Sequence, residues 1–200
     1  MKINFKPSNM LNPVPAILVT TRNKDGQDNV FTVSWTGTIC SNPPMLYISV
    51  TKQRNSFKNL MENPFFIVNL PPKSLVRTVD YCGVIGADKK DKIKERKLTL
   101  VESEKINCAY IDDCPINIEC EVIEVKELGS HFMFIAKIVN NLVDEELIDD
   151  NNKIDFKKAD LMVASHGEYF SLNKNAIGKF GYSISKKKKV ISSYKNKNYL

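Results

Sequence analysis

The sequence predicts a mainly β fold with a few short helices, an α+β domain built around a small antiparallel barrel. Apolar and β-branched runs of strand length recur along the chain, and turn signals rich in Gly, Pro, Asn and Asp separate them. Only residues 54–63 and 74–81 are expected to form helices. A chain of 200 residues is long enough for one domain with a sizeable core.

A hairpin turn and a proline break separate the first predicted strands. Asp25-Gly26 is a strong signal for a tight turn between two strands. Pro43-Pro44 ends the second strand because proline lacks a backbone N–H donor and restricts the residue before it. The strands expected in this half of the chain are residues 14–21, 29–40, 45–51 and 65–70.

The second half of the chain is less regular. A glycine-punctuated, lysine-rich connection is expected at residues 83–97. Apolar and polar residues alternate over residues 116–122, which is typical of a half-buried strand. A turn at residues 128–130 leads into another strand, whose inner face is expected to carry Phe132, Phe134, Ala136 and Ile138.

The formal charge of +6 comes entirely from the end of the chain. Residues 186–200 contain six lysines and no acidic residue, so residues 1–185 carry equal numbers of basic and acidic side chains. We therefore interpret residues 1–185 as one domain and residues 186–200 as a solvated lysine-rich tail, and we expect no nucleic-acid partner. Weak docking of the tail to an acidic partner protein is the alternative.

No apolar run is long enough to span a membrane, and the N-terminus lacks the apolar core of a signal peptide. The protein is therefore expected to be cytoplasmic, with no membrane partner. The five cysteines are widely spaced and form no CxxC pair, which argues against a disulfide framework and against a metal site.

Catalytic motifs built from side chains alone are missing. The sequence has two histidines, no HExxH or GxSxG motif, and neither a Walker loop nor GxGxxG. If the protein catalyses a demanding reaction, a cofactor is expected to supply the chemistry.

Several segments, in this order and at this spacing, resemble the flavin reductase-like, FMN-binding split-barrel family, in particular its flavoredoxin-type members. The resemblance extends over about residues 13–185. The segments are residues 29–35, 42–50 with 54–56, 80–84 with 91–92, 119–122 with 129–131, 169–172 and 177–183.

The resemblance implies a split β-barrel of roughly six to eight antiparallel strands, a homodimer, and FMN near the subunit interface. It also implies an oxidoreductase that passes electrons from NAD(P)H through FMN to a small-molecule or protein acceptor. Three alternatives remain: an FMN-containing electron-transfer protein without efficient NAD(P)H oxidation of its own, a pyridoxamine-phosphate-oxidase-like enzyme, and a β-barrel binding module without flavin.

One predicted strand segment is expected to contact the flavin ring and ribityl chain. Hydroxyl residues alternate with apolar ones here, so on a continuous strand the hydroxyls point to one face. The alternative is ordinary β-propensity. The segment consists of Thr32, Val33, Ser34, Trp35 and Thr36.

The phosphate of FMN is expected near Arg54 and Ser56, at the start of a helix that follows the strand end at Ser49, Val50 and Thr51. A helix N-terminus offers unpaired N–H groups and partial positive charge, and arginine adds a forked cationic donor. The alternative is that Ser56 or Asn55 serves as the helix cap.

By resemblance, Cys82, Gly83 and Val84 belong to a loop that folds over the flavin, and Lys92 can neutralise phosphate charge. Cys82 is interpreted as inert packing, with a redox thiol as the alternative. The sequence departs from the family pattern at Gly86, where the family usually has serine. For Lys92 the alternative is a solvated lysine.

His131 is the predicted catalytic residue, because it follows a tight turn at the expected barrel mouth. By resemblance it lies near the flavin or nicotinamide, where it can position the hydride donor or supply a proton. The alternative is a histidine that stabilises the turn. His166 is expected to be structural or exposed.

Overall fold

A computed structural model describes residues 1–172 and 175–184. The predicted tail, residues 186–200, lies outside the described residues, so the expected domain boundary stays a prediction. Among the described residues, none of the helices has both the length and the apolar composition needed to cross a bilayer.

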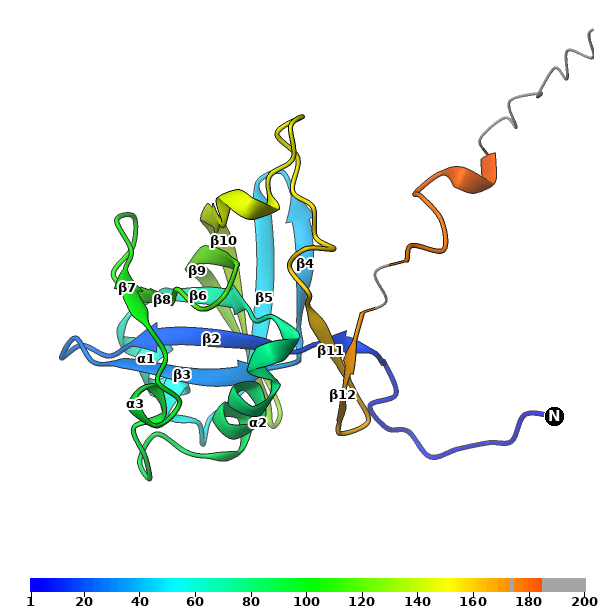
Figure 1. The fold of residues 1–200 in the computed structure, drawn as a ribbon. Coiled ribbons are helices and arrows are strands. Elements are labelled where there is room, and N and C mark those ends of the chain that lie inside the picture. The colour runs from blue at the N-terminus through cyan, green and yellow to red at the C-terminus, as the bar shows by residue number, and fades with distance from the viewer. Residues whose placement is uncertain (173–174, 185–200) are drawn as a thin grey trace, which may run out of the picture.

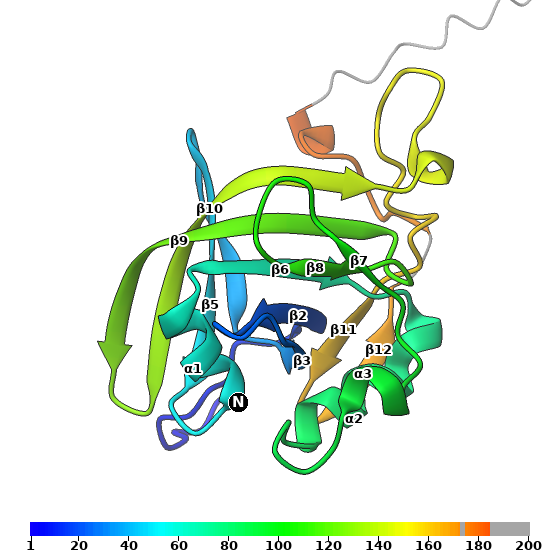
Figure 2. The ribbon, with the colours of Figure 1, turned by 90° about the vertical axis from the view of Figure 1, so that its left-hand side faces the viewer.

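One seven-stranded antiparallel sheet makes up most of the molecule, in the order β3-β2-β6-β9-β10-β5-β4 (Figures 1 and 2). The mainly β prediction with short helices is confirmed. The strands are β2 (Ile17–Arg22), β3 (Asp28–Val33), β4 (Thr36–Ser41), β5 (Pro44–Thr51), β6 (Phe65–Leu70), β9 (Ile116–Leu128) and β10 (His131–Val143).

The sheet curls into a split barrel because its two edge strands are neighbours in sequence. β3 and β4 lie at opposite edges, yet only Ser34 and Trp35 separate them. The backbone N–H of Ser49 in β5 donates to the carbonyl of Trp35 at 2.9 Å, so the link between β3 and β4 stays against β5. The single strand predicted at residues 29–40 is therefore wrong, since the chain breaks at this link and changes edge.

Short helices and two small sheets cover the barrel. Figure 1 shows α2 and α3 beside β2 and β3, and both ends of the described chain extending away from the barrel. The helices are α1 (Asn55–Glu62), α2 (Val76–Val84) and α3 (Lys92–Glu95), with 3-10 turns η1 (Lys73–Leu75), η2 (Glu145–Leu147) and η3 (Tyr182–Ile184). The small sheets consist of β1 (Val14–Pro15), β11 (Met162–Ser165) and β12 (Glu168–Ser171), and of β7 (Leu100–Glu102) and β8 (Ala109–Ile111).

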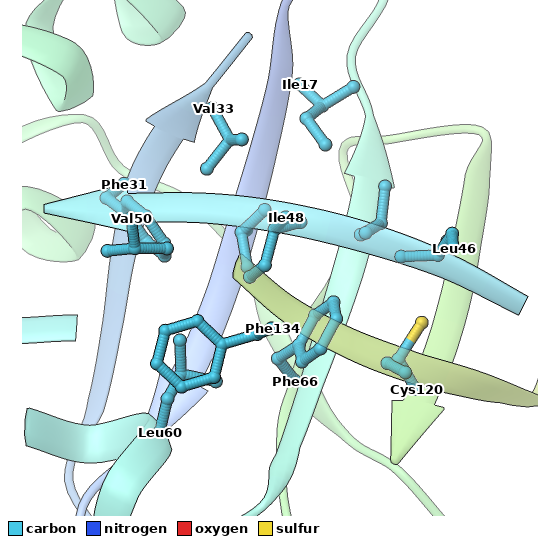
Figure 3. Packing of buried hydrophobic residues seen from close by; sticks show 13 residues of the cluster. Ile17, Phe31, Val33, Leu46, Ile48, Val50, Leu60, Phe66, Cys120 and Phe134 are labelled. Carbon is cyan, nitrogen blue, oxygen red and sulfur yellow. The ribbon is translucent and has the colours of Figure 1, made fainter. Parts of the chain in front are cut away.

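The barrel interior is apolar and closely packed. Figure 3 shows Ile48, Phe66 and Phe134, all fully buried, converging between β5, β6 and β10. Phe132, Phe134, Ala136 and Ile138 belong to this cluster or pack against it, which confirms the predicted inner face of β10. A second apolar cluster joins the outer face of β2 to α2 and fixes the helix on the barrel.

A charged cluster ties the β2–β3 hairpin to β7. The guanidinium of Arg22 forms paired hydrogen bonds with Asp28, at 2.9 and 2.7 Å, and further bonds with Glu102, at 2.8 and 2.6 Å. The side chains of Arg22 and Asp28 are 10% and 13% exposed. Forked arginine–carboxylate pairs of this kind are among the stronger hydrogen bonds in proteins, so the cluster fixes the position of β3.

Candidate functional site

The N-terminus of α1 and the segment between α2 and α3 enclose a cavity of about 270 Å³, here called the α1 pocket. Its wall includes five of the predicted site residues, which the fold brings together from β5, α1, α2 and α3. They are Thr51, Arg54, Ser56, Val84 and Lys92.

Arg54 is the N-cap residue of α1, and its side chain caps no backbone N–H of the helix. One guanidinium nitrogen, Nη2, donates to the carbonyl of Gly83 in the last turn of α2 at 2.7 Å. A guanidinium carries five N–H donors, and the others bond to no described residue. Arg54 therefore joins two helix ends while keeping donors free at the pocket.

Ser56 is almost fully buried, and its Oγ accepts a hydrogen bond of 2.7 Å from the side-chain amide of Asn29. Because Arg54 occupies the N-cap, the interpretation of Ser56 or Asn55 as the cap is wrong. The hydroxyl hydrogen of Ser56 is left to donate, next to the first backbone N–H groups of α1, of which that of Phe57 already bonds to the carbonyl of Arg54 at 2.9 Å. This corner of the pocket therefore offers hydrogen-bond donors to a ligand.

Lys92 is 4% exposed, whereas the neighbouring Lys89, Lys90 and Lys94 are exposed. The interpretation of Lys92 as a solvated lysine is therefore wrong. Its ammonium forms no hydrogen bond or ion pair with any described residue. Burial lowers the pKa of Lys92; the nearby Cys82 opposes this shift, the positive charge of Arg54 adds to it, and Asp88 opposes it. A buried cation that forms no direct ion pair is costly, and an anion bound beside it in the pocket would lower that cost.

The expected row of three hydroxyls along one strand face is not formed. Thr32 donates to the carbonyl of Val79 in α2, and Thr36 donates to the carbonyl of Tyr47 in β5 at 2.6 Å. The break at Ser34 explains the difference, because alternation holds only within a continuous strand. Val33 points into the barrel core and offers a ligand its backbone only.

The end of β5 offers fewer side chains to a ligand than the sequence predicts. Val50 is 2% exposed in the barrel core, so only its backbone can reach a ligand. Ser49 is held by its N–H bond to Trp35, and Thr51 lies in the wall of the α1 pocket.

The segment expected to be a loop over the flavin is helical. Cys82, Gly83 and Val84 form the last turn of α2, which packs so closely on β3 that a side chain at Gly83 would touch Thr32. Cys82 is fully buried, and burial raises the pKa of its thiol. A protonated, enclosed thiol is suited to packing rather than to redox chemistry.

His131, the first residue of β10, contacts Trp35 in the link between β3 and β4. The two ring centroids are 4.6 Å apart, with 33° between the ring planes. His131 pairs with Thr51 across the sheet, which places the stacked rings beside the α1 pocket. The predicted turn is confirmed, with Gly129 at a positive φ of 60°. Ser130 Oγ lies 2.8 Å from Nδ1 of His131, so the histidine also contacts its own turn.

A larger cavity of about 840 Å³ lies on another side of Trp35, between Tyr47, residues 8–12 and the β11–β12 turn. His166 lies in this wall as an exposed turn residue, as expected, and its backbone N–H donates to Asn12 at 3.4 Å. Asn29 and Tyr47, which line these cavities, are not among the site residues predicted from the sequence. Neither shows a local signal, because only the closure of the barrel brings them to the two cavities.

The family model for the flavin reductase like domain matches residues 10–172. The chain therefore belongs to the flavin reductase-like split-barrel family, and the suspected family is confirmed.

Its relatives include solved flavoredoxins. Flavoredoxin of Desulfovibrio vulgaris (Miyazaki F) is 28% identical and superposes with a TM-score of 0.85, over 92% of this chain and 100% of that chain. Flavoredoxin from Methanosarcina acetivorans is also 28% identical, with a TM-score of 0.81 over the same shares. An uncharacterized protein of Archaeoglobus fulgidus is 30% identical over 145 residues, or 72% of this chain and 81% of that protein.

Proposed function

We propose that this protein is an FMN-dependent oxidoreductase that passes electrons from NAD(P)H through FMN to an acceptor. The observation that supports this most strongly is the α1 pocket, where a buried, unpaired Lys92 and the free donors of Arg54 face a helix N-terminus. A phosphate monoester carries about two negative charges and several acceptor oxygens, which is what such a donor set binds.

In this proposal the phosphate is held by Arg54, Ser56, Lys92 and the first N–H groups of α1. The segment from Thr32 to Thr36 directly follows Phe31 in the wall of this pocket, and we propose that its backbone groups contact the ribityl chain and the ring. Cys82 and Gly83 then act by packing and by fixing Arg54. When bound, FMN supplies the capacity to accept a hydride and to release electrons one or two at a time.

The stacked pair of Trp35 and His131 lies where the ring is expected. Trp35 is 43% exposed and presents a flat apolar surface to a planar ligand. His131 can position the nicotinamide of the electron donor or exchange a proton with bulk water. We assign His131 this role because its contact with Trp35 and its pairing with Thr51 hold its ring beside the α1 pocket.

We propose a homodimer as the working form. Large apolar side chains are exposed along the N-terminal arm, the β9–β10 hairpin and the segment after β12. The N-terminal arm extends away from the barrel in Figure 1, and the hairpin does so in Figure 2. Exposed apolar surface of this extent is typical of an interface. Examples are Phe5, Leu11, Leu128 and Phe180. We also propose a cytoplasmic location, a small-molecule or protein acceptor, and no nucleic-acid or membrane partner.

An FMN-containing electron carrier is the second candidate. The likeness to two flavoredoxins over 92% of the chain is the observation that favours it.

The visible spectrum of the purified protein, followed by anaerobic addition of NADH and then NADPH, tests both functions. A yellow protein that bleaches with either nucleotide is the expected result. A yellow protein that bleaches only with a reduced protein partner would favour the carrier. A protein that takes up no FMN would refute both.

A further inference from the structure

One carboxylate lies among the cations of the α1 pocket. The basic side chains in the wall are those of Arg54, Lys89 and Lys92, and Asp88 is the acidic residue among the described residues that line it. A phosphate monoester carries about two negative charges at neutral pH, so a carboxylate nearby repels it. Asp88 is therefore the charged group of the wall that opposes phosphate binding.

Asp88 belongs to a tight turn between α2 and α3. The backbone N–H of Lys89 donates to the carbonyl of Gly86 at 3.1 Å, which closes the turn. Asp88 is exposed, and its carboxylate forms no hydrogen bond or direct ion pair with any described residue. The side chain is therefore free to turn toward water when an anion enters the pocket.

Gly86 lets this carboxylate fold back over the turn. A Cβ atom at position 86 would overlap with Oδ1 of Asp88. Because Oδ1 is the end of a flexible side chain, a methyl group at this position would displace the carboxylate and leave the backbone in place. Gly86 has no positive φ, so its backbone conformation suits alanine.

The carboxylate of Asp88 acts on Lys92, the buried cation of the pocket. Burial lowers the pKa of Lys92, and the negative charge of Asp88 is one of the influences that oppose this shift. In the empty pocket Asp88 therefore provides part of the compensation that a bound anion would provide. A phosphate that enters takes over this role and then faces Asp88 as a like charge.

We propose that Asp88 sets the affinity of the α1 pocket for the flavin phosphate, as an internal anion that competes with the phosphate for Lys92. Three basic side chains against one carboxylate leave the wall positive, so FMN still binds. It binds more weakly, and is released faster, than the cations alone would allow. This rests on the proposed function, because it requires the phosphate of FMN in the α1 pocket.

Two variants test this by different routes. Asp88→Asn removes the charge and keeps the shape of the side chain, whereas Gly86→Ala keeps the charge and displaces it. FMN and riboflavin are titrated into the apoprotein of wild type and of each variant, and the release of FMN is followed by stopped-flow fluorescence.

In Asp88→Asn the affinity for FMN is expected to rise about three- to tenfold, as one surface charge acts on a dianion. Slower release should account for most of this gain. Gly86→Ala is expected to give a smaller gain in the same direction, and riboflavin affinity should stay unchanged in both variants. The matched control Asp150→Asn removes an exposed carboxylate outside the pocket wall and is expected to leave both affinities unchanged.

The outcomes separate this inference from the proposed function. If wild type prefers FMN to riboflavin but Asp88→Asn binds FMN no more tightly, the inference is overturned and the phosphate site stands. Equal gains for both flavins in Asp88→Asn would also overturn it, since the carboxylate would then act on the ring or on the turn itself. A wild-type protein with no preference for FMN over riboflavin would refute the phosphate site of the proposed function.

Discussion

Replacing Lys92 with methionine should move stability and flavin affinity in opposite directions. Methionine has a similar length and fills the same space without the charge. In the apoprotein Lys92 is a buried cation that forms no direct ion pair with a described residue, so its removal should raise the free energy of unfolding by about 1–3 kcal/mol. In the complex the same change removes a charge-assisted hydrogen bond of about 1.5–3 kcal/mol. FMN affinity should therefore fall roughly 10- to 150-fold.

The gain in stability should also depend on pH. Because the pKa of Lys92 is lowered on folding, its charged form opposes folding of the apoprotein. That penalty is complete below the lowered pKa and disappears as the pH rises past the ordinary value of 10.5. The difference between Lys92→Met and wild type should therefore be largest at neutral pH and should shrink in alkaline solution.

Urea denaturation of the apoprotein and fluorescence titration with FMN and riboflavin measure the two effects. Riboflavin lacks the phosphate, so its affinity should be nearly unchanged in the variant. Lys105→Met replaces an exposed lysine outside the α1 pocket and is the control for loss of one charge. A variant that is less stable and binds both flavins more weakly would refute the reasoning, because Lys92 would then be a structural residue.

Three further predictions concern other parts of the chain. His131→Ala should retain FMN but slow its reduction by NAD(P)H about 10²–10⁴-fold; a lower melting temperature with unchanged stopped-flow bleaching would reduce His131 to a turn residue. Arg22→Met leaves the nearly buried Asp28 unpaired and should lower the free energy of unfolding, measured by urea denaturation, by about 3 kcal/mol. A decrease of less than about 1 kcal/mol would show that water replaces the arginine as the partner of Asp28. Removal of residues 186–200 should leave the dimer and FMN affinity intact, since every residue in the wall of the α1 pocket lies between positions 29 and 92; loss of flavin on truncation would place the tail in the site.

Local patterns predicted most of the barrel because they depend on neighbours in sequence. Alternation located β9 and the inner face of β10, and Asp25-Gly26 located the β2–β3 turn, where Gly26 has a positive φ of 80°. The break at Ser34 could not be predicted, since residues 29–40 are rich in strand-forming residues on both sides of it and only closure of the sheet forces the change of edge.

The candidate site was predictable in kind but not in detail. The helix-start pattern correctly placed Arg54 at the beginning of α1, yet its bond to Gly83 depends on how α2 packs. The burial of Lys92 had no local signal either, because four lysines surround it between positions 89 and 97. Selection of one lysine from that group requires the tertiary fold.

The account depends most on Arg54 and the α1 pocket as the phosphate anchor, and paired titrations of FMN and riboflavin into the apoprotein test this directly. Wild type should prefer FMN by at least about tenfold. Arg54→Ala should remove most of that preference by weakening FMN while riboflavin binding stays nearly unchanged, and Ser56→Ala should do so more mildly. Equal losses of both flavins in Arg54→Ala would contradict the account, because Arg54 would then only join α1 to α2 through Gly83.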